Sequence, residues 1–514
     1  MSGGQPNAES LNLKHRDSSI WEKFLAPIVL LMIAITAIIA LVKSLNWPFV
    51  HDAPLMHYIV FLMGHGFSPY RDIFDMNMPG TYMTHWLVFH GLGGSALAWR
   101  FFDLLLTAAT FAAAVYIARP YNRLAGWIIG GILVVEHLSV GAIDLGQRDY
   151  IMAVLLLAAY AFLFSSVRNL RARRMFYSSI LFAWAAGIKP TAVPLAILML
   201  VLGIYVVSRR GERIGMYVLS SAAGCVLVAA ILLAFLVREH SVAAFIQIAL
   251  KLDPYHESIG NVSWRNLLLN LHQVNWALTI VFGLLLLRIC KCWNNWEQWA
   301  LLLGVFFGAA SYVAQRKGWH YHTYPEAYFI YTWIVILCSI AIRSGSRARY
   351  AAAAYLIYIA VLVAPVLLRK EFHSRYSMTN LDSMRADLRT LGGQSLNRNV
   401  QCFDWGAGCI DALYHERIVQ ATGAIYDFYL FPTRPNPVTR PYQDEFFHAL
   451  SKHPPKVLIV TKASWPPGLG YQKIQNWPVF AKFLKHNYHL DTSSSLMANS
   501  QPNASYKIFL RNTL

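Results

Sequence analysis

Charged residues are scarce in this sequence: Asp, Glu, Lys and Arg make up 14% of its 514 residues, whereas hydrophobic residues make up 56%. A chain of this composition is too apolar for an ordinary soluble enzyme, so we expect an integral membrane protein. Acidic residues are the scarcer sign, 26 against 44 basic, which leaves a formal net charge of +18. In a soluble chain that excess would suggest nucleic acid, but here its distribution follows membrane topology, and no nucleic-acid partner is expected.

Several sequence motifs are also absent. The chain has no Walker sequence and no dinucleotide-binding fingerprint, and its glycine cluster GLGG at 91–94 is typical of a loop rather than of a phosphate cradle. No internal repeat of the kind found in transporters with inverted halves is visible. The sequence therefore carries no signature of a nucleotide-binding enzyme or of a transporter built from repeats.

Long apolar runs, in contrast, fill the first two thirds of the chain. A run needs about 17 to 25 residues to cross a hydrocarbon core of roughly 30 Å, and eleven candidates are found, several of them short. They lie at 24–42, 96–118, 124–140, 150–167, 175–188, 191–208, 214–237, 273–288, 298–314, 324–342 and 350–368. We predict an α-helical polytopic membrane protein with about eleven transmembrane helices.

Lys and Arg collect in alternate loops between these runs. Short basic loops stay on the cytoplasmic side, and all of these fall on one side if the amino terminus is cytoplasmic. They contain Lys14, Arg16, Lys23, Arg119, Arg123, Arg168, Arg171, Arg173, Arg174, Arg209, Arg210, Arg213, Arg288, Lys291, Arg343, Arg347 and Arg349. The first run lacks a small-residue cleavage site, which indicates a retained anchor. We expect a cytoplasmic tail at 1–23, a membrane domain at 24–368 and a periplasmic domain at 369–514, in a bacterial inner membrane.

The segments predicted outside the membrane are longer than the cytoplasmic loops. Two amphipathic stretches, 53–66 and 80–93, are too short to cross unaided and are predicted to lie as helices at the outer interface, joined by the loop FSPYRDIFDMNMP. A further apolar helix is expected near 241–251. In the tail, a buried strand at 455–460 between two helical patterns predicts a small C-terminal α/β domain.

The chain has six cysteines, and only Cys402 and Cys409 fall in the predicted outer domain. A local disulfide between them is expected in an oxidising compartment. Two unpaired buried cysteines are the alternative. A metal site here would need a third and fourth ligand at matching spacing, and the sequence offers none, so no metal is expected at this pair.

Ionisable residues near the predicted outer ends of the spans form one set. Such residues usually pair or line a cavity, because a charge at a helix centre in the membrane costs roughly 2 to 3 kcal/mol. Arg and Lys suit phosphate, and a neighbouring carboxylate can take a proton from a hydroxyl nucleophile. The set therefore fits transfer from a lipid-linked phosphate to an alcohol. It comprises Asp52, Arg71, Asp72, Asp75, Arg100, Asp103, Glu136, His137, Asp144, Arg148, Asp149, Lys189, Arg238, Arg316, Lys317, His320 and His322.

Four stretches at these positions resemble a known family. They are GHGFSPYRDIFDMNMPG after the first span, LAWRFFDLL opening the second, GIKPTAVPL between the fifth and sixth, and RKGWHYHTYPEAYF entering the tenth. With the Asp at the outer end of the first span, they look like the GT-C superfamily of polyprenyl-phosphate-sugar-dependent glycosyltransferases. The pattern is nearest to the branch that includes protein O-mannosyltransferases, bacterial aminoarabinose transferases acting on lipid A and rhizobial galacturonosyltransferases. The resemblance covers roughly 20–345.

The resemblance implies roles for particular residues. The first-loop Asp that activates the acceptor in that family matches Asp52 here, and Asp72 is the candidate second carboxylate. The basic residues that hold the lipid-linked phosphate match Arg148 and Lys189 by position. Further candidates for binding the phosphate or the sugar are Arg71, Arg100, Lys317, His320 and His322.

The sequence also departs from the family pattern. A second acid is common before the catalytic Asp, and here that position is His51; the common Lys-Pro-Pro is replaced by Met78-Pro79-Gly80. These departures leave the choice between Asp72 and Asp75 open and the sugar unassigned.

Structural alternatives exist for the same residues. An Asp before Pro54 is common at a helix end, so a purely local role is the alternative for Asp52. Lys189 fits an interface lysine that snorkels, and Arg148 can pair with Asp149 at a helix start. The two histidines before the tenth span fit an aromatic interface belt.

These observations together predict a membrane glycosyltransferase. It would move a sugar from a polyprenyl-phosphate donor to a hydroxyl of an outward-facing glycan, lipid or protein, with inversion because one base activates the hydroxyl for direct displacement. A flippase or transporter of lipid-linked saccharide and a polysaccharide polymerase or ligase are the alternatives. Charges gathered on one face rather than at the midplane favour the enzyme. No cofactor is expected, with a divalent metal at His320 and His322 as the lesser alternative.

Overall fold

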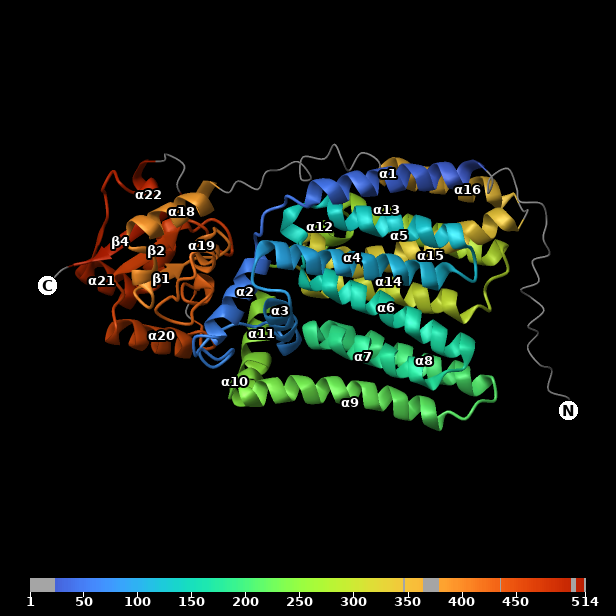
Figure 1. Ribbon diagram of the computed structural model, residues 1–514, viewed down its shortest axis with the longest axis horizontal. Coiled ribbons are helices and arrows are strands. Elements are labelled where there is room, and N and C mark those ends of the chain that lie inside the picture. The colour runs from blue at the N-terminus through green and yellow to red at the C-terminus, as the bar shows by residue number, and fades with distance from the viewer. Residues whose placement is uncertain (1–23, 345–346, 364–378, 435, 501–504, 513–514) are drawn as a thin grey trace.

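Long helices form an elongated bundle, and the C-terminal residues form a unit with a small sheet against one end of it (Figure 1). The computed structural model describes residues 24–344, 347–363, 379–434, 436–500 and 505–512. The predicted fold class, a polytopic helical membrane protein with a small C-terminal α/β part, is confirmed. The predicted tail at 1–23, the end of the last predicted span at 364–368 and the start of the predicted outer domain at 369–378 lie outside the described residues.

Eight helices of the described chain are long and apolar enough to cross a membrane. They are α1 (Ala26–Ser44), α4 (Ala96–Ala118), α6 (Arg148–Asn169), α8 (Val193–Arg209) with the preceding turn η4 (Pro190–Ala192), α9 (Gly215–Arg238), α13 (Leu271–Ile289), α14 (Trp296–Gln315), and α15 (Tyr324–Arg343) with the preceding turn η6 (His320–Thr323). Three shorter helices pack alongside them, namely α5 (Arg123–Ser139), α7 (Ala172–Ile188) and α16 (Ala348–Val363). The chain is therefore an integral membrane protein, and each predicted run matches a helix of this set within a few residues.

Helices α6 and α15 lie at the centre of the bundle. In their most apolar windows 83% and 89% of the residues are buried, against 22% in α9, whose outer face exposes leucine and valine as a lipid-facing helix does. Glycines allow the closest approaches. Gly304 and Gly308 of α14 lie one turn apart and face α15, where a Cβ at Gly308 would collide with the backbone of Glu326.

The basic clusters lie at the end of the bundle away from the C-terminal unit. The turns from α4 to α5, α6 to α7, α8 to α9, α13 to α14 and α15 to α16 gather at that end (Figure 1). There Arg168 pairs with Glu297 (Nη2 to Oε2, 2.5 Å), and Arg343 donates to the carbonyl of Tyr121 at 2.6 Å. The alternation of basic and non-basic loops along the sequence thus corresponds to two different ends of the bundle.

Short helices connect the spans at the other end. They are α2 (Asp52–Met63), α3 (Pro79–Gly91), α10 (Val242–Gln247), the π-helix η5 (Ile248–Leu252), α11 (Asp253–Ser258) and α12 (Trp264–Leu268). Nine of the 12 residues of α2 are buried, because this helix packs against α3 and against α19 (Cys409–His415) of the C-terminal unit. It therefore lies beneath that unit, where the sequence predicts a helix at a free interface.

A four-stranded sheet of order β1-β2-β4-β3 forms the centre of the C-terminal unit. Strands β1 and β2 pair in parallel, and β4 pairs antiparallel with both of its neighbours. The strands are β1 (Val400–Phe403), β2 (Val457–Thr461), β3 (Tyr488–Leu490) and β4 (Tyr506–Arg511). The remaining helices are α18 (Thr379–Thr390), α20 (Arg440–Lys452), α21 (Pro478–Asn487) and α22 (Met497–Ser500). Strand β2 is buried at every position and matches the run predicted at 455–460.

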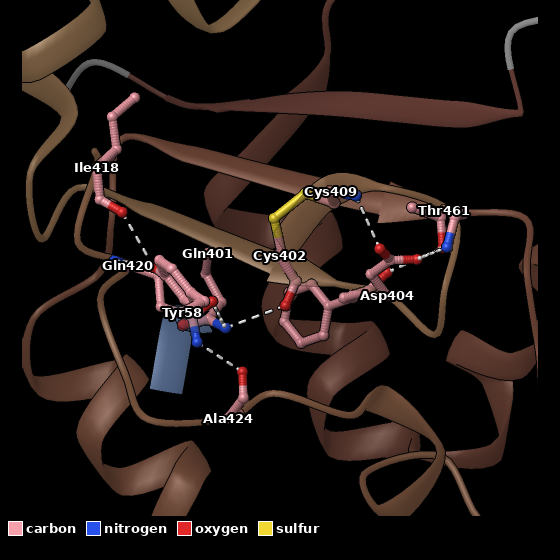
Figure 2. The surroundings of a disulfide bond; sticks show 11 residues. Tyr58, Gln401, Cys402, Asp404, Cys409, Ile418, Gln420, Ala424 and Thr461 are labelled. Carbon is pink, nitrogen blue, oxygen red and sulfur yellow. Dashed lines mark hydrogen bonds between the residues drawn. A yellow bond between two sulfur atoms is a disulfide. The ribbon is translucent and has the colours of Figure 1, made fainter. Parts of the chain in front are cut away.

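A disulfide joins Cys402 of β1 to Cys409 at the start of α19 (Figure 2). Inside the loop that it closes, Asp404 accepts hydrogen bonds from the Cys409 amide at 2.8 Å and from Thr461 Oγ1 at 2.9 Å. The covalent bond and these hydrogen bonds hold the end of β1 and the start of α19 in one arrangement.

Polar contacts fasten the unit to the bundle. The hydroxyl of Tyr58 in α2 donates to the Ile418 carbonyl at 3.0 Å and accepts from the Gln420 amide at 2.9 Å (Figure 2). Gly423 packs so tightly that an added Cβ would overlap the backbone carbonyl of Asp72. These contacts place residues 404–428 of the unit directly over the first loop of the membrane part.

Candidate functional site

A cavity of about 770 Å³ lies where the bundle meets the C-terminal unit. Its wall combines the starts of α2 and α6, the turn between α7 and α8, the turn before α15, and residues of the C-terminal unit. Among the described residues, three arginine or lysine side chains line it, and they are Arg148, Lys189 and Lys317. Six acids line it, and they are Asp52, Asp144, Asp253, Glu257, Asp404 and Asp411. In a chain with a net charge of +18, this cavity therefore has an excess of carboxyl groups.

Asp52 is the first residue of α2, where the helix dipole favours a negative charge. Its Oδ2 accepts a hydrogen bond from Nη2 of Arg148 at 3.3 Å, and its Oδ1 lies 3.4 Å from Nδ1 of His51. Burial alone would raise its pKa, but His51, Arg148 and a hydrogen bond from Gln147 outweigh burial and hold the pKa of Asp52 below its ordinary 3.8. With its side chain 25% exposed, Asp52 faces the cavity as a carboxylate at neutral pH.

Two cations extend the same wall. Arg148 is the first residue of α6, and its buried Nε has no hydrogen-bond partner within the described chain. Lys189 ends α7, and its Nζ lies 2.6 Å from Oδ2 of Asp149 and donates to Oε1 of Gln315 at 2.7 Å. Burial lowers the pKa of Lys189, and the charge of Asp149 works against that effect. The pair offers a guanidinium donor and an ammonium group to an anion in the cavity.

Asp144 lies in the turn η3 (Ala142–Asp144) between α5 and α6. Its side chain is 1% exposed, and Oδ2 accepts a hydrogen bond from the hydroxyl of Tyr324 at 2.9 Å. Burial raises the pKa of Asp144 to about 7, against the stabilising hydrogen bond from Tyr324 and with repulsion from Asp149, Asp52 and Glu136. A carboxyl group that titrates near neutral pH therefore lies in the same wall as Asp52.

The turn between α14 and α15 forms the side of the cavity that holds Lys317, His320 and His322. The Nζ of Lys317 donates to three backbone carbonyls at the end of α11, the nearest that of Ile259 at 2.7 Å. His320 is exposed, whereas His322 is 3% exposed and its Nδ1 has no hydrogen-bond partner among the described residues. Lys317 therefore fastens α11 to the bundle, and the histidines present imidazole groups to the cavity.

The opposite wall comes from the C-terminal unit. Asp404, Trp405 and Asp411 line it around the disulfide, with Tyr426 beside them. Burial raises the pKa of Asp411 well above its ordinary value, and repulsion from Asp404 and Asp52 adds to the effect. The unit thus supplies a polar and aromatic roof over Asp52.

Arg71 and Asp72 line a second cavity, of about 750 Å³, on the other side of the first loop. They pair with each other at 2.8 Å and are 46% and 34% exposed. Asp72 also accepts a hydrogen bond from the amide of Ser68 at 2.7 Å. Between the cavities Asp75 is fully buried, and its Oδ2 accepts hydrogen bonds from Tyr82 at 2.5 Å and Asn77 at 2.7 Å.

Arg100 is enclosed within the bundle. It is 3% exposed, forms an ion pair with Asp103 on the same helix, and donates from Nη2 to Ser44 of α1. It does not line the first cavity.

The structure brings together six of the residues predicted for the site, and they are Asp52, Arg148, Lys189, Lys317, His320 and His322. It places Arg71 and Asp72 at the second cavity and Arg100 in the bundle. Sequence reasoning did not select Asp411. Its signal is an acid two residues after the second cysteine of CFDWGAGCID, which has no meaning until the docking of the C-terminal unit is known.

No protein-family model matches the chain, and no curated protein matches it at a significant level. Solved structures do. One is ArnT from Cupriavidus metallidurans bound to undecaprenyl phosphate, with a TM-score of 0.54, 12% identity, and coverage of 94% of this chain and 98% of that one.

The apo oligosaccharyltransferase of Archaeoglobus fulgidus matches with a TM-score of 0.55, 11% identity, and coverage of 95% and 76%. The same enzyme, AglB, in complex with an inhibitory peptide and a dolichol-phosphate, matches with a TM-score of 0.50, 12% identity, and coverage of 94% and 75%. At 11 to 12% identity, these matches show that the chain shares the fold of these proteins and no more. The fold that the resemblance implied is therefore confirmed.

Proposed function

We propose, from the fold shared with these polyprenyl- and dolichol-phosphate-binding proteins, that this chain is a membrane glycosyltransferase. It transfers a sugar from a polyprenyl-phosphate donor to a hydroxyl group of an outward-facing glycan, lipid or protein. The observation that carries the proposal is one cavity in which an ionised Asp52 lies beside Arg148, with Lys189 on the same wall. A base and two cations are the groups that displacement of a lipid phosphate by an alcohol requires.

Asp52 is proposed as the base. Its carboxylate takes the proton of the acceptor hydroxyl while that oxygen forms a bond to the anomeric carbon and the bond from this carbon to the phosphate oxygen breaks. Attack from the face opposite the leaving group inverts the configuration of that carbon. A carboxylate whose pKa lies below its ordinary value stays ionised at neutral pH and is ready for this step.

Arg148 and Lys189 are proposed to hold the donor phosphate. The unpartnered Nε of Arg148 and the ammonium of Lys189 stabilise the negative charge that the leaving lipid phosphate acquires. His320 and His322 are proposed to contact the donor from the turn before α15, with Lys317 holding α11 beside them. Arg71, Asp72 and Arg100 take no step in this proposal, because they lie outside the cavity.

The orientation is proposed from the two ends of the bundle. Basic turns are retained on the cytoplasmic side, so the cavity and the C-terminal unit face the periplasm of a bacterial inner membrane. The acceptor then reaches Asp52 from outside, and the lipid carrier reaches Arg148 from the bilayer.

Mass spectrometry of the glycolipids of a deletion strain tests the proposal. We expect a polyprenyl-phosphate sugar to accumulate and one glycosylated product to disappear, with both changes reversed by the wild-type gene and not by an equally expressed Asp52→Asn variant. Restoration of the product by that variant would overturn the assignment of the base. Purified protein in liposomes that moves the lipid-linked sugar across the bilayer without forming product would instead support a flippase.

A further inference from the structure

A continuous chain of hydrogen bonds leads from the cavity into the bundle. Oδ2 of Asp144 lies 2.9 Å from the hydroxyl of Tyr324, which lies 3.1 Å from Nδ1 of His137. Nε2 of His137 lies 2.9 Å from Oδ1 of Asp103. The four residues come from η3, α15, α5 and α4, so the chain joins three helices to the wall that holds Asp52.

All four residues of this chain of hydrogen bonds are almost completely buried. Asp103 is fully buried, Asp144 and His137 are each 1% exposed, and Tyr324 is 2% exposed. Of the four, only Asp144 lines the cavity. Burying polar groups at this depth is costly unless each is satisfied, and the proposed transfer step uses none of them.

The chain can hold one mobile proton in two ways with the same heavy atoms. With the proton on Asp144, its carboxyl donates to the oxygen of Tyr324, whose hydroxyl donates to Nδ1 of His137. With the proton on His137, Nδ1 donates to Tyr324, whose hydroxyl donates to the ionised Asp144. In both arrangements Nε2–H of His137 donates to Asp103. Without that proton, the single hydrogen of Tyr324 can serve Asp144 or His137 but not both.

An acidic side chain and an aromatic ring lie against His137. Asp103 pairs with Arg100 and accepts a hydrogen bond from the amide of Gly146 at 3.3 Å. The ring of His137 stacks on that of Tyr150 with centroids 3.6 Å apart and an angle of 4°. An acidic side chain at Nε2 and an aromatic face beneath the ring are therefore the groups next to a proton that arrives at Nδ1.

We infer that Tyr324 relays a proton between Asp144 and His137, which makes Asp144 a second acid–base group of the cavity, recharged from inside the bundle. The step moves one proton from Oδ2 of Asp144 to the oxygen of Tyr324 as the hydroxyl proton of Tyr324 moves to Nδ1 of His137, and it reverses without an oxidant or a co-reactant. Its use in catalysis rests on the proposed transferase function. There it lets Asp144 accept the proton that Asp52 removes from the acceptor and return to its starting state.

Other ionisable groups act on both ends of the relay. Those that face Asp144 are Asp52 of α2, Glu136 of α5, Asp149 of α6 and Tyr324 of α15. Those that face His137 are Asp103 of α4, with Arg100 behind it, Tyr150 of α6 and Tyr324 of α15. Burial raises the pKa of Asp144 to about 7, so this end of the relay titrates near neutral pH.

Infrared difference spectroscopy of the purified protein in nanodiscs tests the relay without a substrate. The C=O band of protonated Asp144 is assigned by its loss in Asp144→Asn, and the ring bands of His137 by labelling histidine with ¹³C and by His137→Asn. As the pH falls through 7 we expect both sets of bands to change together. In Tyr324→Phe we expect only the Asp144 band to change, at a pH higher by about one unit because the stabilising donor is lost.

Tyr328→Phe is the matched control. Tyr328 lies one turn further along α15, is fully buried like Tyr324, and is no member of the relay. In Tyr328→Phe we expect the Asp144 band and the His137 bands to change together with pH, as in the wild type. If the His137 bands of the wild type stay constant while Asp144 titrates, or if Tyr324→Phe titrates like Tyr328→Phe, the relay is wrong.

Transfer rates separate this inference from the proposed function. We expect Tyr324→Phe to lower kcat by about 10-fold or more with KM within about two-fold, because a proton-transfer partner is lost while binding groups stay. Tyr328→Phe should keep both constants. If the wild type transfers no sugar, the proposed function fails while the infrared titration still decides the relay. If the wild type is active and Tyr324→Phe keeps its full kcat, the catalytic use of the relay fails alone.

Discussion

The two cavities between the bundle and the C-terminal unit are almost equal in volume, about 770 and 750 Å³, but their charges are held differently. In the first, Asp52 and Lys189 are 25% and 15% exposed, and each has a partner from a different helix. In the second, Arg71 and Asp72 are neighbours in sequence that pair with each other and are 46% and 34% exposed. Exposed neighbouring pairs contribute little, because water screens them.

The difference shows that charged residues in the same loop of the sequence can belong to different sites in the structure. Asp52 and Asp72 both follow the first span and both have an arginine partner. Only Asp52 is fixed by groups from a distant helix, 96 residues further along the chain at Arg148. An arrangement that several elements must build together is what an active site needs, whereas an arginine beside its own neighbour requires no fold.

Replacing Asp52 and Asp72 in turn tests the difference between the two cavities most directly. We expect Asp52→Asn to lower kcat by roughly 10² to 10⁴, because it removes the base and keeps the shape. Asp72→Asn should change kcat by less than about three-fold, because its exposed pair touches no reacting group. Rates are measured with the polyprenyl-phosphate sugar that accumulates in the deletion strain. Equal losses in both variants would mean that the second cavity belongs to the reaction.

One lysine from each cavity allows a second test of the difference between them. Lys189 lines the first and Lys251, which is exposed, lines the second. We expect undecaprenyl phosphate to raise the melting temperature of the wild type by binding the folded state. Lys189→Met should weaken this binding by about 10- to 100-fold, because one charge-assisted contact to the phosphate is lost.

Lys251 provides the control for the substitution of Lys189. Lys251→Met should bind the lipid as the wild type does. Lys189→Met should also melt earlier without lipid, since Asp149 is left buried without its cation. A variant at Lys189 that binds undecaprenyl phosphate normally would move the phosphate site elsewhere.

Much of the fold follows from local chemistry. The apolar runs end within a few residues of the observed helices, as at Ala96–Ala118, because lipid requires each crossing segment to satisfy its own backbone. Strand β2 is also predictable from the sequence, since its run of Val, Leu and Ile is buried on both faces. The position of α2 is not, because the contact that covers it joins Tyr58 to Ile418, 360 residues away.

Part of the candidate site is likewise predictable from the sequence, and part depends on contacts between distant segments. Asp52, Arg148 and Lys189 lie at helix ends on the same end of the bundle, so counting the predicted crossings brings them together. Asp72 lies 20 residues beyond Asp52, yet the short bridge between Pro69 and Ile73 turns it to the other cavity. Neither that turn nor the docking of Asp411 over Asp52 has a signal in local sequence.

Gly423 tests whether the separation of the cavities matters. This residue of the C-terminal unit lies against the backbone of Asp72, in the layer between the two cavities, and an added Cβ would overlap that carbonyl. We expect Gly423→Ala to destabilise the protein by roughly 1 to 3 kcal/mol, because backbone has to move. Gly91→Ala is the control, since apart from its chain neighbours and the backbone of its own helix no atom of the described residues lies within 4 Å of an added Cβ. Melting curves in detergent measure both, and equal melting temperatures would refute the close docking.

The smallest expected effect is a shift in pH dependence. The base must be ionised, and the charges of His51 and Arg148 hold the pKa of Asp52 below 3.8, so the acid limb that reports Asp52 should lie near that lowered value, below the step that protonation of Asp144 produces near pH 7. In Arg148→Gln burial acts with less opposition, and we expect the acid limb of kcat to move up by about one unit or more. The rate at the plateau also falls because a phosphate ligand is lost, so the comparison uses the midpoint of the limb and not its height. Arg71→Gln removes the matching charge at the second cavity and should leave the midpoint unchanged. An acid limb that stays in place in Arg148→Gln would show that Asp52 is not the group whose ionisation controls transfer.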